Sequence, residues 1–241
     1  MSRLPPIPDP LDCVLFDAGD TLLAPAPSFQ GRFVAVAADQ GFPLEEAAVD
    51  AAIAAAVRAA AWPDDWTDPA TQREFWIGFY RDVLARLGHA DDGLRLAEAL
   101  FASFSDPASY RLFDDVRPAL DELAGRGVTL GVVSNFEPWL ADILALQGID
   151  HLFATVAISG VLGVAKPDPQ IFEAALAEAG ADPSSTVHVG DQPANDVAAA
   201  RSVGITPVLI DRYARYPAPD DTHRVEDLLG LLKLVNGRGS G

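Results

Sequence analysis

The second half of the chain alternates short apolar runs with helical patterns, and this alternation constrains the fold more than any other feature. From about Leu112 onward, runs rich in Val, Leu and Ile end in turn residues, and helical periodicity follows them. Short apolar runs bounded by turns are typical of strands buried on both faces. Alternating strands and helices predict a three-layer, doubly wound α/β fold with a mostly parallel sheet.

The elements of this fold are expected in a regular order. The strands are predicted at residues 14–16, 128–133, 155–158, 187–189 and 205–210, with 205–210 as the last core strand. The helices of the same region are predicted at about residues 118–124, 138–146, 169–179, 195–204 and 228–235.

Residues 25–111 carry only helical patterns. Asp68 is followed by Pro69, which is the order of an N-cap and a first helical residue. The four expected helices run from about 28 to 40, 44 to 61, 69 to 87 and 94 to 104. We predict that they form a small bundle inserted after the first strand.

Two linkers set the predicted domain boundaries. An Ala-Pro-Ala-Pro run at 24–27 ends the first core segment, and the pattern changes again at residues 110–112. We expect an α/β core formed by residues 1–24 and 112–241, and a helical domain at 25–111, with hinges near both linkers.

Composition and charge exclude several classes of protein. Hydrophobic residues make up 49% of the 241 residues, which is enough for a sizeable core. The formal charge of −18 repels nucleic acid and anionic lipid, so neither is expected as a partner. The sequence shows no signal-peptide pattern at its start and no apolar stretch long enough to span a bilayer. We therefore expect a soluble, cytoplasmic protein.

Polar side chains gather where the predicted strands end. In open parallel sheets, ligands bind at the carboxyl ends of the strands. The clusters are Asp17 with Asp20 and Thr21, Ser134 with Asn135, Lys166, and Asp191 with Asp196. Each cluster alone is also typical of a turn, a cap or a solvated surface. Together they supply a carboxylate that can act as a nucleophile or a metal ligand, a hydroxyl, an amide, one cation and further carboxylates.

This set of groups suits a phosphate bound together with one magnesium ion. Magnesium takes a few carboxylates, and waters and phosphate oxygens complete its ligands. The ammonium of Lys166 is a point-charge partner for phosphate. The residues expected to bind substrate are Thr21, Ser134, Asn135 and Lys166.

These clusters resemble the four motifs of the haloacid dehalogenase-like (HAD) hydrolase superfamily. Residues 17–22 (DAGDTL) match the first motif and residues 133–135 (VSN) the second. Residues 166–169 (KPDP) match the third and residues 189–196 (VGDQPAND) the fourth. The helical insertion lies where members with a helical cap carry theirs. The resemblance covers nearly the whole chain and implies a Rossmann-like core with a helical cap. From the composition of the two linkers, we expect this cap to open for substrate and to close and exclude water.

The resemblance also implies catalytic roles. Asp17 would attack phosphorus and become an aspartyl phosphate, which water would then hydrolyse. Ser134 and Lys166 would hold the phosphoryl oxygens during this transfer.

A magnesium site is implied by the same motifs. Asp17, the main-chain carbonyl of Gly19 and Asp191 would bind the ion. Asp196 would be a further ligand or a partner of Lys166.

One position departs from the pattern of the family's phosphatases. They usually carry an aspartate two residues after the nucleophile, which protonates the leaving group and then activates water. This position is Gly19 here. General acid–base help contributes roughly 10²–10⁴-fold. Asp20 follows directly. If the turn matches that of the family, we expect Asp20 to cap or brace the loop, with substitution for the missing acid as the alternative.

Three functions are compatible with this departure. The first is a magnesium-dependent phosphatase for a small phosphorylated metabolite, restricted to good leaving groups or assisted by another residue. The second is a catalytically weak binding or regulatory protein that keeps the fold. The third is a metal-independent 2-haloacid dehalogenase, a class that also lacks the second aspartate. Asp191 after Gly190, and the lack of Arg or Lys between Arg32 and Arg58, argue against the third.

Several further features are interpreted as structural. The single cysteine, Cys13, excludes an internal disulfide and is predicted to be buried in the first strand. His188 lies inside a strand and is predicted to be a packed core histidine. Residues 62–66 (WPDDW) are predicted to close the helical bundle, with substrate contact by the aromatic rings as the alternative. Residues 236–241 are predicted to form a frayed tail.

Overall fold

The computed structural model describes residues 4–63, 66–217 and 221–236 of the chain. The chain forms two compact units. One unit consists of Met1–Leu23 and Leu112–Gly241, and the other is Ala24–Arg111. The first unit is an α/β core, and the second is helical.

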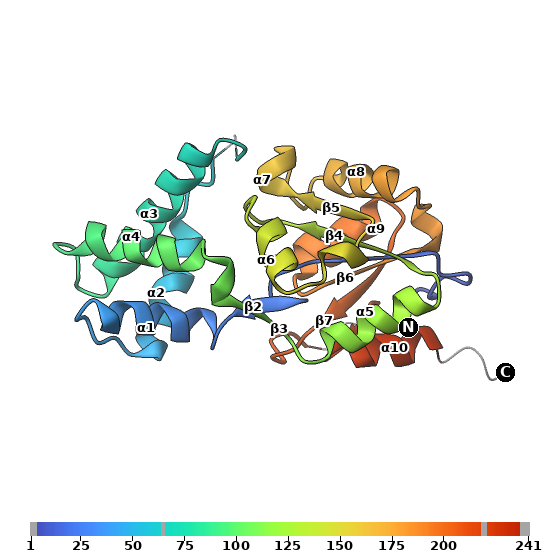
Figure 1. Ribbon diagram of the computed structural model, residues 1–241, viewed down its shortest axis with the longest axis horizontal. Helices are drawn as coiled ribbons and strands as arrows, with labels where there is room; N and C mark the ends of the chain where they lie inside the picture. Colours follow the sequence, from blue (N-terminus) through green and yellow to red (C-terminus); the bar gives the residue numbers. More distant parts are fainter. Residues whose placement is uncertain (1–3, 64–65, 218–220, 237–241) are drawn as a thin grey trace. The chain divides into compact units, whose positions relative to one another are not determined.

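A parallel sheet runs through the core unit (Figure 1). Six strands of the described residues form it, in the order β5-β4-β1-β6-β7-β8. The strands are β1 (Cys13–Phe16), β4 (Thr129–Ser134), β5 (Thr155–Ile158), β6 (Thr186–Gly190), β7 (Thr206–Ile210) and β8 (His223–Val225). Every neighbouring pair is parallel, and β1 lies between β4 and β6.

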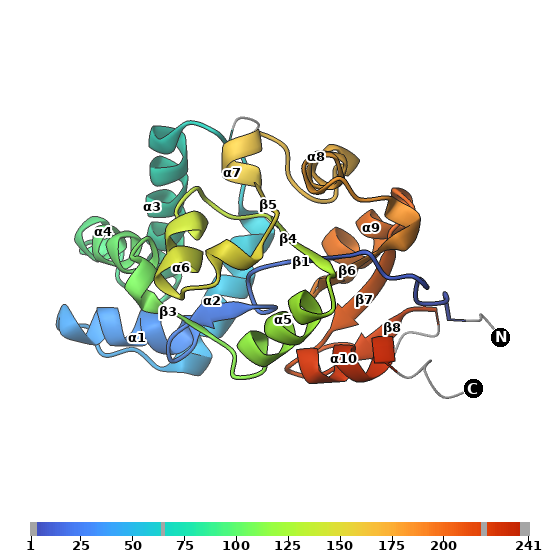
Figure 2. The same ribbon diagram turned by 45° about the vertical axis from the view of Figure 1, so that its right-hand side comes forward.

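Helices cover both faces of this sheet. Figures 1 and 2 together show α8 (Pro169–Ala179) and α9 (Ala199–Ser202) on one face, and α5 (Val116–Gly125) and α10 (Leu228–Asn236) on the other. Leu15 and Phe172 belong to the buried apolar cluster between the sheet and the first pair of helices. The three-layer α/β fold is therefore confirmed.

The central strand β1 and its two neighbours bring polar residues to one edge of the sheet. All four residues of β1 are fully buried, because neighbouring strands and both helical layers surround them. Asp17 follows β1 immediately, Ser134 ends β4, and Asp191 follows β6. Since the strands are parallel, these three residues lie at the same edge of the sheet.

The core differs from the sequence-based prediction at its last strand and at one helix. β8 adds an edge strand beyond β7, and its three residues are too few and too polar to give a strand pattern. The helix predicted at 195–204 is a π-helical turn, η4 (Pro193–Ala198), followed by the short α9. Wide π turns are frequent at functional sites.

Two shorter helices, α6 (Leu140–Leu146) and α7 (Ser159–Leu162), complete the described α-helices of this unit.

The segments that connect the two units pair with each other. β2 (Leu23–Pro25) and β3 (Tyr110–Leu112) form a two-stranded sheet. The prolines around β2 hide any strand pattern in the sequence. These are the segments predicted as hinges, and movement there stays a prediction.

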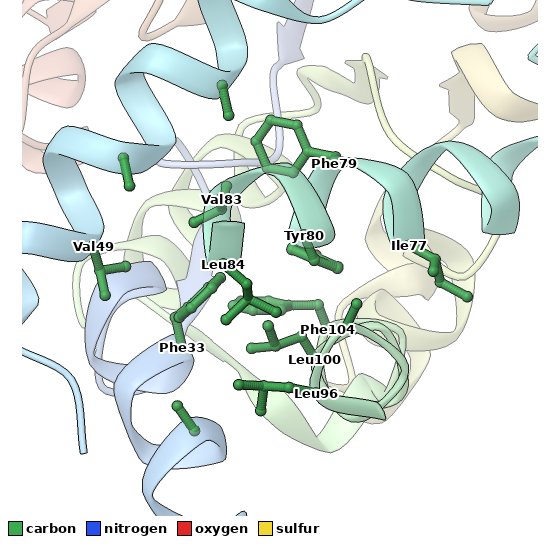
Figure 3. Packing of buried hydrophobic residues seen from close by; sticks show 14 residues of the cluster. Phe33, Val49, Ile77, Phe79, Tyr80, Val83, Leu84, Leu96, Leu100 and Phe104 are labelled. Atoms are coloured by element: carbon green, nitrogen blue, oxygen red, sulfur yellow. The ribbon is translucent and has the colours of Figure 1, made fainter. Parts of the chain in front are cut away.

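Four α-helices of the described residues build the helical unit. They are α1 (Phe29–Asp39), α2 (Glu46–Ala59), α3 (Pro69–Arg86) and α4 (Gly93–Phe104). Ser28 and Asp68 are the N-caps of α1 and α3, and each side chain accepts a hydrogen bond from a backbone N–H of the first turn. Figure 3 shows the buried faces of the helices meeting in one apolar cluster that includes Phe33, Tyr80 and Leu100. The predicted four-helix insertion is confirmed.

A helix that crosses a bilayer has to be long and predominantly apolar. In the described parts of the chain, none is both long enough and apolar enough to cross a membrane. The 18-residue α3, for example, contains Arg73, Glu74 and Arg81.

Candidate active site

The carboxylate of Asp17 is the point at which two donors meet. Ser134 Oγ, from the end of β4, donates a hydrogen bond of 3.0 Å to Asp17 Oδ1. Lys166 Nζ donates to the same oxygen over 2.7 Å. All three side chains are buried. The backbone N–H of Asp17 donates to the carbonyl of Val189, which ties the end of β1 to β6.

Lys166 is positioned through its backbone. Asn135 Nδ2 donates to the Lys166 carbonyl over 2.8 Å, and the Lys166 N–H donates to Asn135 Oδ1 over 2.7 Å. Both ends of the Asn135 amide therefore hold the loop that carries Lys166. Contact between Asn135 and substrate stays a prediction.

Asp196 is the second carboxylate bound by the lysine. Lys166 Nζ donates to Asp196 Oδ1 over 2.6 Å, and the N–H of Gln192 donates to Asp196 Oδ2 over 2.9 Å. Asp196 is 1% exposed. A buried ammonium is costly unless it is paired, and here two carboxylates pair with it.

Three buried carboxylates of this centre fit a divalent cation. Asp17, Asp191 and Asp196 each offer one oxygen, and these oxygens lie within 4.8 Å of one another. Asp191 Oδ1 is buried and has no hydrogen-bond partner among the described residues. A cation would satisfy this oxygen, and a set of carboxylate oxygens is the kind that magnesium binds.

Burial and the crowding of carboxylates control the charges of the centre. Burial raises the pKa of Asp17; the ammonium of Lys166 opposes this effect, and the charge of Asp196 adds to it. Burial, together with the charges of Asp17 and Asp196, raises the pKa of Asp191 to about 8. Burial alone would raise the pKa of Asp196, but Lys166 and His188 hold it below its usual range.

The pKa of Lys166 shows the opposite balance. Burial alone would lower it, but the charges of Asp17 and Asp196 outweigh burial and raise the pKa above its usual value. This balance favours the charged form of Lys166. When all three carboxylates are ionised, they carry more negative charge than Lys166 offsets, and a divalent cation would balance it.

Residues 18–23 form a tight turn next to the candidate nucleophile. The N–H groups of residues 21–23 all donate to the carbonyl of Ala18. A Cβ built on Gly19 would meet no other atom within 4 Å. The turn therefore has room for a side chain at the position where the family's phosphatases carry an aspartate.

Two predicted contacts of this turn stay predictions. Thr21 is fully buried, and its Oγ1 has no hydrogen-bond partner in the part of the chain that the structure describes. Its carbonyl accepts hydrogen bonds from Arg212. The substrate contact of Thr21 and the metal contact through the Gly19 carbonyl are expected when ligands bind.

The loop after β7 contributes residues that the sequence analysis missed. Arg215 donates to the Asp20 carboxylate over 2.9 Å and lies 3.5 Å from Asp191 Oδ2. The Tyr213 hydroxyl donates to Asp20 over 3.4 Å. Asp20 thus pairs with residues of this loop, and its expected role in its own turn stays a prediction. Their place in the sequence could have indicated the loop residues, because residues 211–216 directly follow a buried strand and so lie at the same edge of the sheet as the other polar clusters.

His188 is fully buried, which confirms the prediction of a core histidine. Its ring packs edge-on against Phe172, with ring centroids 4.9 Å apart. It also has a contact that the sequence analysis missed. His188 Nε2 lies 3.0 Å from Asp196 Oδ1.

The aromatic segment of the helical unit lies partly outside the described residues, which exclude Asp64 and Asp65. On either side of them, Trp62 and Trp66 both contact Phe75, with ring centroids 4.7 and 5.0 Å apart. These contacts agree with a loop that closes the bundle, and a substrate contact stays a prediction. The predicted tail is also outside the described residues, except for Asn236, which ends α10.

The parallel sheet holds a buried lysine at its carboxyl edge, and this lysine pairs with two of three neighbouring carboxylates. Such a fold and site define an α/β enzyme with an acidic centre. The family model described as haloacid dehalogenase-like hydrolase matches residues 11–204. The chain belongs to this family, and it is a hydrolase. The resemblance found in the sequence is confirmed.

Individual relatives agree with this assignment. Haloacid dehalogenase-like hydrolase domain-containing protein 3 of Danio rerio is 34% identical over 208 residues, which cover 84% of this chain and 86% of the relative. Phosphoserine phosphatase of Thermus thermophilus is 36% identical over 151 residues, 62% of this chain and 58% of that protein. The fold is similar to the magnesium-bound HAD-hydrolase YfnB from Bacillus subtilis, with a TM-score of 0.75 and 19% identity over 93% of this chain and 98% of that one.

Proposed function

We propose that this protein is a magnesium-dependent phosphatase that acts on a small phosphorylated metabolite. The observation that carries the proposal is the convergence of Lys166 and Ser134 on Asp17 Oδ1. Two further buried carboxylates lie beside Asp17. A nucleophile, a hydroxyl, a cation and a candidate metal site are the groups that phosphoryl transfer uses. The name of the Thermus relative, phosphoserine phosphatase, supports a phosphate ester as substrate.

Asp17 is the proposed nucleophile. One of its carboxylate oxygens attacks phosphorus, and the bond between phosphorus and the leaving-group oxygen breaks. The leaving group departs with the electron pair of that bond, and an aspartyl phosphate results. Water then attacks phosphorus, the bond to Asp17 breaks, and inorganic phosphate and the free carboxylate are formed.

Lys166 and Ser134 would bind the phosphoryl group during both steps. An ammonium has three N–H donors, and the described residues use two of those of Lys166, through Asp17 and Asp196. The third donor is available to a phosphoryl oxygen. The Ser134 hydroxyl can turn from Asp17 towards the same group. These fixed donors would stabilise the charge that develops in the transition state.

Asp17 and Asp191 would hold the magnesium ion together with the Gly19 carbonyl. Asp191 is the strongest candidate of the three, because its Oδ1 is buried without a partner among the described residues. Asp196 would join them or anchor Lys166. Magnesium bound there would supply positive charge for the phosphoryl oxygens and orient the group for attack.

Gly19 narrows the proposed substrate range. A glycine cannot protonate a leaving group, so esters whose leaving group departs as a stable anion would react best.

The helical unit, residues 25–111, is proposed to act as a cap on the core formed by residues 1–24 and 112–241. Its movement about β2 and β3 would exclude water during the reaction.

The test is the turnover of p-nitrophenyl phosphate with and without magnesium. This substrate has a good leaving group and tolerates the missing acid. We expect magnesium-dependent turnover that is lost in Asp17→Asn and retained in Asp221→Asn, a control at an exposed ion pair with Arg201. Far-UV circular dichroism of both variants checks that they fold.

Two outcomes would contradict the proposal. A native protein that binds magnesium and phosphate without turnover would be a weak binding or regulatory protein. Halide release from 2-chloropropionate without a magnesium requirement would identify a dehalogenase.

A further inference from the structure

Strand β6 provides a cradle for the carboxylate of Asp196. His188 and Gly190 are two residues apart on this strand, so both face the same side of the sheet. A Cβ built on Gly190 would overlap the side chain of Asp196. Glycine at this position leaves the space that the carboxylate occupies, and His188 Nε2 reaches the same carboxylate over 3.0 Å.

Both oxygens of Asp196 are engaged in this cradle. Oδ1 lies within hydrogen-bond distance of His188 Nε2 and of Lys166 Nζ, which is 2.6 Å away. Oδ2 accepts from the N–H of Gln192 over 2.9 Å. Rotation of this buried carboxylate would break these bonds, so its orientation is fixed.

The direction of the histidine bond follows from its partner. An ionised carboxylate only accepts hydrogen bonds, so His188 donates its Nε2–H to Asp196. His188 Nδ1 is buried and has no hydrogen-bond partner among the described residues. If only Nε2 of the ring carries a proton, Nδ1 is an acceptor without a partner. If Nδ1 carried a proton as well, it would be a donor without a partner.

We propose that His188 is a positioning residue for the reaction. It fixes the carboxylate of Asp196, and Asp196 fixes the ammonium of Lys166 at 2.7 Å from Asp17 Oδ1. This inference rests on the proposed function, because the position of the Lys166 ammonium affects turnover only if the ammonium binds the transferring phosphoryl group. A long lysine side chain has many rotamers, and a fixed acceptor selects the productive one.

A matched pair of substitutions separates this role from simple packing. His188→Gln places an amide N–H near the position of Nε2, and His188→Met fills a similar volume without a donor. We expect His188→Gln to keep most of the native kcat for p-nitrophenyl phosphate. We expect His188→Met to lose about 10- to 100-fold in kcat, with KM little changed, because an outer partner of the centre is removed. Melting temperatures of both variants check the fold.

A second readout needs neither magnesium nor turnover. Side-chain ¹⁵N–¹H correlation spectra of the metal-free protein report which ring nitrogen carries the proton. We expect a proton on Nε2 of His188 that exchanges slowly with solvent, and a shift of its signal in Asp196→Asn.

The outcomes are distinguishable. Equal kcat in the two His188 variants, or a proton on Nδ1, would overturn the positioning role even if native turnover depends on Asp17. Absence of any Asp17-dependent turnover in the native protein would overturn the proposed function, and the positioning role with it.

Discussion

The ammonium of Lys166 lies 2.7 Å from Oδ1 of Asp17, although the two residues are 149 positions apart in the sequence. Both side chains are buried, with 3% and 7% of their surface exposed. The parallel sheet brings Asp17 to its carboxyl edge, and the loop held by Asn135 brings Lys166 to the same place. Each charge therefore stabilises the other in the interior, and Asp196 also pairs with the ammonium of Lys166.

Replacing the lysine should test this dependence. Lys166→Met leaves Asp17 and Asp196 buried without their shared cation. We expect a decrease of about 3–5 kcal/mol in the free energy of unfolding and loss of phosphatase turnover. Urea unfolding followed by circular dichroism measures the first effect. Lys233→Met, at an exposed lysine of α10, is the matched control and should behave as the native protein. Native-like stability of Lys166→Met would show that the buried pair is not needed.

The missing acid can be restored at Gly19. A Cβ at this position meets no atom within 4 Å, so a side chain should be accommodated. We expect Gly19→Asp to raise kcat for esters with poor leaving groups, by up to roughly 10²-fold, because it supplies a general acid. The gain should be small for p-nitrophenyl phosphate. Gly19→Asn has the same shape without an acidic proton, so an equal gain in that variant would contradict the explanation.

Gly190 should tolerate no side chain. A Cβ there would overlap the Asp196 side chain. We expect Gly190→Ala to displace that carboxylate, to lower the free energy of unfolding by about 1–3 kcal/mol and to reduce kcat. Gly125→Ala in α5 is the control, since a Cβ at Gly125 meets no atom within 4 Å. If both alanine variants kept native kcat, Asp196 would not need its present position.

A second ion pair of the core should control stability in acid. Asp115 and Arg212 form two hydrogen bonds of 2.9 Å, and the N–H of Leu228 also donates to Asp115. Burial alone would raise the pKa of Asp115, but the bonds from Arg212 and Leu228 outweigh burial and lower it. We expect Asp115→Asn to reduce the free energy of unfolding by about 3 kcal/mol at neutral pH.

The pH dependence of this effect has a definite sign. The pKa of Asp115 is lower in the folded protein than in the unfolded chain, where it is about 3.9. Its contribution to stability is therefore complete above about pH 4 and is lost as the pH falls through the folded-state value. Urea unfolding at pH 7 and in acid should show the difference between native protein and Asp115→Asn becoming smaller in acid. A difference that stays constant would contradict the assignment.

The sequence predicted the elements whose patterns are local. The apolar runs ending at Asp17, Ser134 and Asp191 are recognisable because buried parallel strands are almost continuously hydrophobic. The N-cap Asp68 is recognisable because a short polar side chain has a preferred place at a helix start. The edge strand β8 was missed, since three residues paired on one side carry no such pattern.

The contacts within the site depend on tertiary structure. Asp196 was predicted as a metal ligand or a partner of Lys166, and the structure shows the contact with Lys166. The contact of His188 with Asp196 could not be read from the sequence, because an apolar run that contains one histidine is typical of any buried strand. Arg215 was missed for a different reason. Polar residues of a loop become specific only when the fold brings Asp20 and Asp191 beside them.

The central claim is that Asp17 carries the phosphoryl group during turnover. Its most direct test is rapid acid quenching of the protein during the reaction with p-nitrophenyl phosphate and magnesium, followed by peptide mass spectrometry. We predict a phosphoryl group on Asp17 that appears with substrate, requires magnesium and is absent in Asp17→Asn. Steady turnover with an unmodified Asp17 at every quench time, or with the phosphoryl group on another residue, would contradict the account.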